Sequence, residues 1–207
     1  NDFKYIARVA DFAFAIFALK EAPYSDWKGL LAHAKSKGAI TFGTQVPLQR
    51  LIAAEIGKLE GFEIRSVPFK GGSKLMASIL GGHLDIGISG GAYFPHLDAG
   101  KIKVLAAAGS NRIPSIPDAP TLRDLGYDYA LDLFNLVIAP AGVSDEIVNK
   151  LDNAFAKAVT DPAYKELIGK KMRMGATYMG RKDVTNFLIK ERDGLTTMAK
   201  AMGKKGS

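Results

Sequence analysis

Short apolar segments of strand length alternate with segments of helical periodicity through the middle of this chain. That alternation limits the possible folds more than any other feature. The strand-like runs lie at residues 12–19, 40–43, 62–68, 84–88 and 102–108. Between them, apolar side chains recur at helical spacing over residues 25–34, 47–57 and 73–80. This pattern predicts an α/β fold in which a mostly parallel sheet carries helices on both faces.

Cap and turn residues mark the ends of these predicted elements. Ser25 is a suitable N-cap for the first helix, and Gly81–Gly82 supplies the positive φ that ends the third. Three prolines within residues 114–120 forbid a helix and predict an extended surface connection.

The last third of the chain predicts a second group of elements. An apolar strand is expected over residues 131–139, followed by a helix capped by Ser144 and another that begins at Asp161–Pro162. The final amphipathic helix, residues 181–202, has an apolar side made of Val184, Phe187, Leu188, Leu195 and Met198. Two α/β lobes explain this organisation better than one.

Composition excludes several classes of protein. The 207 residues include no cysteine, so a disulfide scaffold, a thiolate metal site and a cysteine nucleophile are excluded. No apolar run approaches the ~18–20 residues that cross a bilayer. Because the chain opens at Asn1 with neither methionine nor a leader, we expect a processed or truncated start.

The net charge of +7 is concentrated near the C-terminus. Residues 161–207 carry 11 Lys and Arg against 5 Asp and Glu, whereas the first 160 residues carry 17 against 16. Such a face could attract nucleic acid, anionic lipid or an anionic solute. A solvated helix surface is the simpler interpretation, because no aromatic-interleaved basic stretch or zinc-finger spacing accompanies the charge. A basic nucleic-acid-binding module therefore stays a second alternative function.

Residues 87–91, Gly-Ile-Ser-Gly-Gly, match the G-x-S-x-G nucleophile elbow and follow a predicted strand. A serine hydrolase that uses Ser89 is therefore the first alternative function. That fold needs an acid and then a histidine later in the chain, but the three histidines lie at positions 33, 83 and 96. We expect no enzyme activity and no catalytic residue.

Three glycine-containing junctions follow predicted strands. They are Gly43-Thr44-Gln45, Lys70-Gly71-Gly72-Ser73 and Ser89-Gly90-Gly91. In an open α/β sheet, ligands lie beyond the carboxyl ends of the strands, where helix N-termini present free N–H groups. The junctions therefore predict an anion pocket. Metal-ligand spacings and nucleotide-binding glycine motifs are missing from the sequence, so no metal and no cofactor are expected.

A series of short motifs between residues 67 and 142 has a further meaning. The motifs are VPFKGG at 67–72, LGGHLDIGI at 80–88, AGKIKVLA at 99–106, RIPSIPDAPT at 112–121 and APAG at 139–142. In this order and spacing they resemble the solute-binding proteins of tripartite tricarboxylate transporters, the Bug or TctC-type periplasmic receptors. The resemblance extends from about residue 2 to about residue 202.

The resemblance implies a two-lobed fold of the type II periplasmic-binding-protein kind, closing on its solute by a hinge. Residues 1–12 and 131–207 would form the first lobe and residues 13–130 the second. Members of the family are roughly a third longer, so the N-terminal half of the first lobe would be missing. The implied partners are a small di- or tricarboxylate or related organic acid and membrane transporter subunits, with no nucleic acid. Self-association through the incomplete lobe is also expected.

The resemblance also implies the solute contacts. They would come from the loop Gly43, Thr44, Gln45 and Val46, chiefly the backbone amides of residues 44–46, from Lys70, Gly71 and Gly72, and from Ser89, Gly90 and Gly91. Phe134 would pack against the solute body where the family usually has Trp. The loop after residue 43 is shorter and poorer in glycine than is usual, and Arg50-Leu51 stands where the family has His-Leu. Arg50 is either a carboxylate partner or a solvated residue of the first helical turn.

Overall fold

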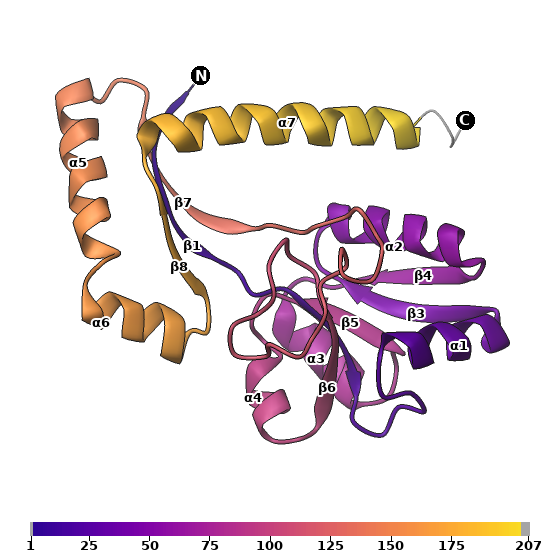
Figure 1. Cartoon of the computed structure of the whole chain (residues 1–207). Coiled ribbons are helices and arrows are strands. Elements are labelled where there is room, and N and C mark those ends of the chain that lie inside the picture. Colours follow the sequence, from indigo (N-terminus) through magenta and orange to yellow (C-terminus); the bar gives the residue numbers. More distant parts are fainter. Residues whose placement is uncertain (1, 204–207) are drawn as a thin grey trace. The chain divides into compact units, whose positions relative to one another are not determined.

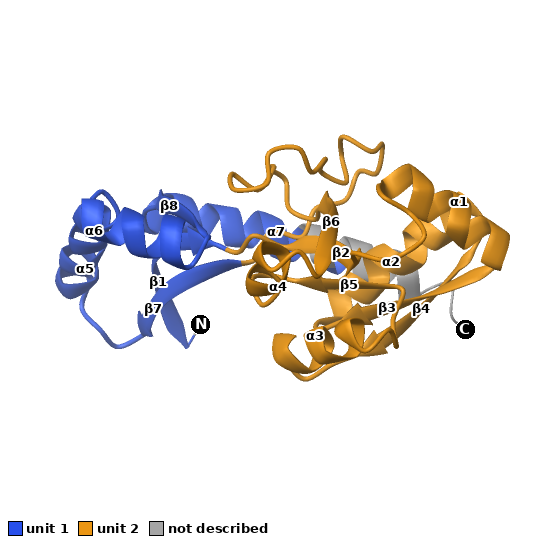
Figure 2. Ribbon diagram, turned by 90° about the horizontal axis from the view of Figure 1, so that it is seen from below, with its two compact units in different colours: residues 1–11, 134–207 blue, residues 12–133 orange. Residues whose placement is uncertain are grey.

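The computed structural model describes residues 2–203, with residues 194, 195 and 197–203 described by their backbone alone. Figure 1 shows the order of the elements along the chain. The chain divides into two compact units, unit 1 (residues 1–11 and 134–207) and unit 2 (residues 12–133), which are coloured separately in Figure 2.

Unit 2 is built on a five-stranded sheet with the strand order β4-β3-β5-β2-β6. Its strands are β2 (Ala15–Leu19), β3 (Ala39–Thr44), β4 (Glu63–Pro68), β5 (Ile86–Ser89) and β6 (Ile102–Ala107). β3 runs parallel to β4 and β5, whereas β2 runs antiparallel to β5 and β6. The predicted mostly parallel sheet is confirmed, with β2 reversed. β2 also begins three residues later than the predicted strand at residues 12–19.

Helices cover both faces of this sheet, as predicted. They are α1 (Trp27–Lys37), α2 (Pro47–Glu60), α3 (Gly72–Leu80) and α4 (Phe94–Asp98). Trp27 of α1 and Ile52 of α2 lie with Phe42 of β3 on one face. Leu75 and Ile79 of α3 pack against β3 and β5 on the other, because successive strand residues point to opposite faces.

The N-cap of α1 is Asp26, so the prediction of Ser25 is wrong by one residue. An Asp26 carboxylate oxygen accepts a hydrogen bond from the Gly29 N–H at 2.7 Å. An aspartate caps a helix as well as a serine does, so the sequence preference alone does not separate the two positions. The end of α3 is as predicted, since Gly82 has a φ of 71°.

The connection at residues 110–120 contains no helix, but it is more than a surface segment. Ile113 and Ala119 are 3% and 6% exposed, and Ile113 belongs to the apolar core on the α3 side of the sheet. Arg112 donates a hydrogen bond to the Pro117 carbonyl at 2.9 Å. The extended path that the prolines impose is therefore held down by buried side chains.

Asp85, just before β5, joins that strand to β3. One carboxylate oxygen accepts from the N–H and the hydroxyl of Thr41 at 2.7 and 2.8 Å, and the other pairs with Lys37 Nζ at 2.8 Å. Burial alone would raise the pKa of Asp85, but the bonds from Lys37 and Thr41 outweigh it and hold that pKa below its ordinary value.

Unit 1 contains a three-stranded antiparallel sheet with the order β7-β1-β8. Its strands are β1 (Phe3–Asp11), β7 (Phe134–Pro140) and β8 (Gly175–Met179). β1 and β8 are not among the predicted elements, and the predicted strand at residues 131–139 begins only at Phe134. Irregular register in β1 places Ile6 and Ala7 both in the core, which removes the alternation that marks a strand.

The helices of unit 1 follow the predicted order. They are α5 (Asp145–Ala158), α6 (Pro162–Lys165), which continues into a π-helical turn (Glu166–Lys171), and α7 (Arg181–Gly203). Ser144 and Asp161 cap α5 and α6 as predicted, accepting from Ile147 N at 3.3 Å and Ala163 N at 2.7 Å. On α7, Val184 is buried as expected. Leu195 and Met198 lie outside the described side chains.

We predict that Asp85→Asn destabilises unit 2 by about 1–3 kcal/mol at pH 7, because it removes a charged acceptor of several hydrogen bonds. The folded-state pKa is depressed, so the stabilisation exists above about pH 3.9 and is lost as the pH falls through the folded value. Urea unfolding followed by fluorescence of Trp27, the single tryptophan, measures this in unit 2.

The matched control is Asp128→Asn, whose side chain is 99% exposed in its ion pair. It should change the unfolding free energy by less than about 0.5 kcal/mol. An Asp85→Asn deficit that is equally large at pH 3 and pH 7 would contradict the assigned role of the carboxylate.

Candidate functional site

The parallel strands of unit 2 bring the three predicted junctions to one sheet edge. β3 pairs in register with β4, with Thr44 beside Pro68, and with β5, with Gly43 beside Gly87. The segments that leave the carboxyl ends of these strands are therefore neighbours. Each leads towards a helix, α2 after β3, α3 after β4 and α4 after β5.

Gly72, the first residue of α3, lies where these junctions converge. A Cβ at this position would be 3.3 Å from Ser89 Oγ, 3.5 Å from Gln45 Nε2 and 2.5 Å from the Ala92 Cβ. The structure thus brings Gln45, Gly72 and Ser89, one predicted residue from each junction, to one point. The last of these distances is too short for a real side chain, which explains why this position is glycine.

The N-terminus of α3 has no side-chain cap. Its N-cap is Gly71, with a φ of 106° that favours glycine, and no side chain bonds to the first turn. Lys70 is exposed beside it, and the first turn contains no acidic residue. The unpaired N–H groups and the helix dipole make this end of α3 attractive to an anion.

The backbone amides of the loop from Thr44 to Val46 have a different hydrogen-bond partner from the solute that the resemblance implies. Gln49 Oε1 accepts hydrogen bonds from the backbone N–H groups of Gln45 at 2.6 Å and Val46 at 3.2 Å. Gln49 is only 1% exposed. Two of the three amides expected to bind a solute therefore already have an internal partner.

Gln49 is a residue that the prediction missed as a determinant of the site. The signal lies in the sequence, because Gln at the third position of a helix characteristically reaches back to the N–H of the N-cap. Thr44 is also buried, 1% exposed, and neither its Oγ1 nor Gln49 Nε2 has a hydrogen-bond partner. Gln49 lies with Phe42 and Ile52 on the α2 side of the sheet, and strand alternation turns Thr44 to the side opposite Gln45, so both atoms lie away from the Gly72 convergence.

The remaining glycines of the predicted site have separate roles. Gly43 lies under α3, where a Cβ would be 2.7 Å from Leu84 and 3.2 Å from Leu75. A Cβ at Gly90 would meet the Phe14 ring at 3.0 Å. Gly91, by contrast, has no atom within 4 Å of a Cβ position, so the structure is open there.

Phe134 lies in unit 1, separate from the three junctions, which all belong to unit 2. Its ring centroid is 5.5 Å from that of Phe187 on α7, and the Arg8 guanidinium lies 4.7 Å from the Phe134 ring. Arg8 is held by Asp11 at 2.6 Å. Part of the Phe134 surface is therefore covered by its neighbours within unit 1.

Arg50 is exposed on α2.

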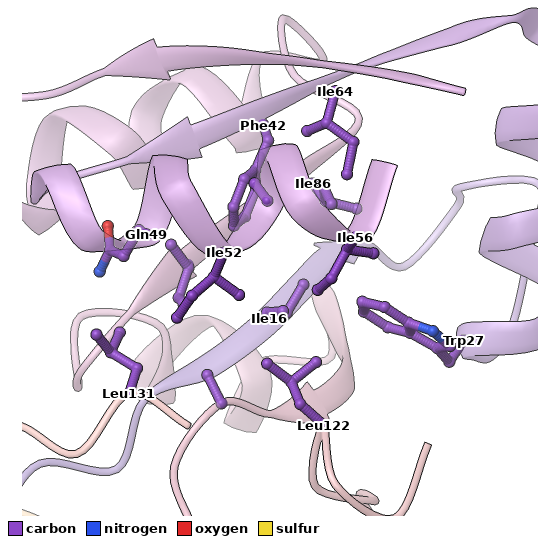
Figure 3. A pocket seen from close by; sticks show the side chains of 13 residues that line it. Ile16, Trp27, Phe42, Gln49, Ile52, Ile56, Ile64, Ile86, Leu122 and Leu131 are labelled. Carbon is purple, nitrogen blue, oxygen red and sulfur yellow. The ribbon is translucent and has the colours of Figure 1, made fainter. Parts of the chain in front are cut away.

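The opposite face of the unit 2 sheet encloses a small hollow of about 20 Å³. Its lining is apolar except for Gln49, which lies at one end, with Trp27 at the opposite end (Figure 3). The volume is close to what a single water needs and smaller than any organic carboxylate. This hollow is part of the core and is distinct from the Gly72 convergence.

The serine hydrolase alternative finds little support in the described residues, and a metal site and a membrane span were not expected from the sequence. None of the hydrogen bonds described for residues 2–203 joins Ser89 to a histidine. Within the described part of the chain, no group of three His, Asp or Glu residues could hold a metal ion. Nor does any described helix combine the length and apolarity needed to cross a membrane.

Comparison with known proteins gives a consistent family. Residues 1–203 match the family described as "Tripartite tricarboxylate transporter family receptor". A UPF0065 protein of Cupriavidus necator is 30% identical over 190 residues, which are 90% of this chain and 58% of that protein. The chain spans about half the length of the curated relatives it matches.

Solved structures show the same fold. A TctC solute-binding protein from Polaromonas is 25% identical with a TM-score of 0.77, over 97% of this chain and 70% of that one. An R. palustris protein determined with adipate is 22% identical with a TM-score of 0.85, over 98% of this chain and 69% of that one. The predicted resemblance and fold class are confirmed.

We predict that Gln49→Leu destabilises unit 2 by about 1–3 kcal/mol, because the N–H groups of Gln45 and Val46 lose their acceptor. Amide hydrogen exchange at these two residues should become faster by at least tenfold. Arg50→Ala, one residue away and exposed, should change neither quantity. Unchanged exchange at Gln45 and Val46 in Gln49→Leu would show that the Gln49 oxygen does not hold the loop.

Proposed function

The chain belongs to the tripartite tricarboxylate transporter receptor family, and on that premise we propose that it captures a small carboxylate. It would present this solute to membrane transporter subunits of the tripartite tricarboxylate type. The solute class extends to di- and tricarboxylates and related organic acids. A periplasmic location goes with this role, as in the solute-binding proteins that the chain resembles.

The convergence at Gly72 is the observation that carries this proposal. An uncapped helix N-terminus lies beside the polar side chains of Ser89 and Gln45, at the carboxyl edge of three parallel strands. A carboxylate that accepts several hydrogen bonds from neutral donors needs no cationic side chain. The R. palustris protein of the same fold was determined with adipate, a dicarboxylate, which agrees with this solute class.

We further propose that the two units correspond to the two lobes of a receptor. Unit 1 would belong to the first lobe and unit 2 would be the second, close to the predicted divisions at residues 12–13 and 130–131. Closure of two lobes excludes water from the charge-assisted bonds to the solute. Phe134 would contribute from the first lobe. Self-association of this chain through its first lobe belongs to the same proposal.

Calorimetry with dicarboxylates tests this assignment. A solute held by unit 2 alone would lose two of the hydrogen bonds that the complete first lobe supplies, and each charge-assisted bond is worth about 1.5–3 kcal/mol. Its binding should therefore be weaker than in a complete receptor by on the order of 10²- to 10⁴-fold. We therefore predict weak or undetectable heats for this chain, with binding restored when a preceding N-terminal segment is supplied. Micromolar binding by the chain alone, as a monomer, would refute the lobe assignment.

Native mass spectrometry of gently purified protein would identify a retained solute.

The alternative of a serine hydrolase has its own test. Because no described hydrogen bond joins Ser89 to a histidine, the hydroxyl should stay unactivated. We predict no labelling by a fluorophosphonate probe under conditions that fully label a known serine hydrolase. Stoichiometric labelling that Ser89→Ala abolishes would replace the receptor function with an enzymatic one.

A further inference from the structure

We propose that the side chains of Ser89 and Gln45, together with the N-terminus of α3, bind the carboxylate of the solute in place of the backbone amides of the β3–α2 loop. This inference rests on the proposed function and specifies which groups of unit 2 determine its ligand. It differs from the implied contacts because Gln49 already occupies the N–H groups of Gln45 and Val46.

Strand alternation places these side chains on the correct face. Ile86 and Ile88 of β5 line the hollow on the α2 side, so Gly87 and Ser89 point to the α3 side. On β3, Phe42 likewise lines the hollow while Gly43 contacts Leu75 of α3. Gln45 follows the same alternation, and its Nε2 reaches the first residue of α3.

Ser89 is the polar group that points to a ligand. It is 3% exposed, and its hydroxyl takes part in none of the hydrogen bonds described for residues 2–203. Its Oγ is not among the fully buried polar atoms left unpaired, so the hydroxyl reaches open space beside the helix end, where a ligand or a water can satisfy it. Its oxygen lies 3.3 Å from the Cβ position of Gly72, facing the uncapped end of α3.

The charges and space around α3 suit an anion. Lys70 precedes this nine-residue helix and Lys74 lies in its first turn, where acidic residues usually stand. Two lysines near a helix N-terminus interact unfavourably with its dipole, whereas an anion bound there is attracted both by the dipole and by the lysines. The Cβ positions of Gly71 and Gly91 have no atom within 4 Å, so a solute can approach beside both junctions.

The chemistry selects a carboxylate over a neutral amide. The Ser89 hydroxyl, the Gln45 amide nitrogen and the α3 N–H groups are all donors, and a carboxylate accepts from all of them at once. Bonds to a charged acceptor are about twice as strong as neutral ones. Gln45→Glu should therefore close the site to anions, since it replaces a donor with a second negative charge.

The experiment is a ¹H–¹⁵N NMR titration of the whole chain with succinate, which detects millimolar binding. Succinamide is the neutral control ligand. Succinate should shift the amides of residues 71–74 and 89–91, and succinamide should not. Ser89→Ala should raise the Kd by about ten- to a hundredfold, which is the loss of one charge-assisted bond. Gln45→Glu should abolish the shifts.

Matched controls separate recognition from folding. Ser36→Ala, an exposed serine on α1, should leave the Kd unchanged. Retention of the wild-type spectrum outside the site shows that each variant is folded. If Ser89→Ala fails to fold, Ser89→Gly removes the hydroxyl instead, and Ser89→Thr, which keeps a hydroxyl, should bind succinate like the wild type.

The outcomes distinguish this inference from the proposed function. Succinate binding that Ser89→Ala and Gln45→Glu leave unchanged overturns the inference and leaves the receptor function standing. Shifts centred on residues 44–46 and 49 would show that the solute displaces Gln49, which also overturns it. No shift of any amide at 50 mM succinate also overturns the inference, and the receptor function is then decided by the calorimetry of the extended chain.

Discussion

The close approach of α3 to the sheet is the constraint on which the site depends. Gly43 and Gly87 are paired in register on adjacent parallel strands. Because both are glycines, no Cβ projects from either strand towards α3 at this point. Leu75 fills the space above both, because a Cβ would lie 3.2 Å from it at Gly43 and 2.8 Å at Gly87. The helix can therefore rest directly on the strand backbones. This packing brings its N-terminus close to Ser89 and Gln45.

The sequence predicts this architecture well where local signals and tertiary packing agree. Glycines between strands and helices mark the three junctions, and parallel pairing then brings Gln45, Gly72 and Ser89 together. The prediction fails where a tertiary contact decides the outcome. β2 runs antiparallel to β5 and β6, and no periodicity in the sequence encodes the direction of a strand.

The β3–α2 loop shows the same limit at the level of single atoms. Glycine and threonine after a strand suggest free amides, but whether those amides face a solute depends on one side chain three residues beyond the N-cap. The Gln49 oxygen acts on Gln45 and Val46 much as a bound carboxylate would. The same strand-to-helix motif can therefore bind an anion in one protein and have its amides bonded by a side chain of its own helix in another.

The two polar atoms left unpaired beside this loop indicate how firmly it is held. Gln49 gives its oxygen to two amides, yet its Nε2 and the nearby Thr44 Oγ1 are buried without partners. Each such atom costs about 1–3 kcal/mol, while each bond that the oxygen accepts contributes about 0.5–1.5 kcal/mol. Removing the Gln49 oxygen would leave both amides without an acceptor, so the two bonds stabilise the loop although the Gln49 Nε2 is unpaired. The hydrogen bonds that Gln45 and Val46 donate to Gln49 therefore hold the loop and fix the direction in which its amides point.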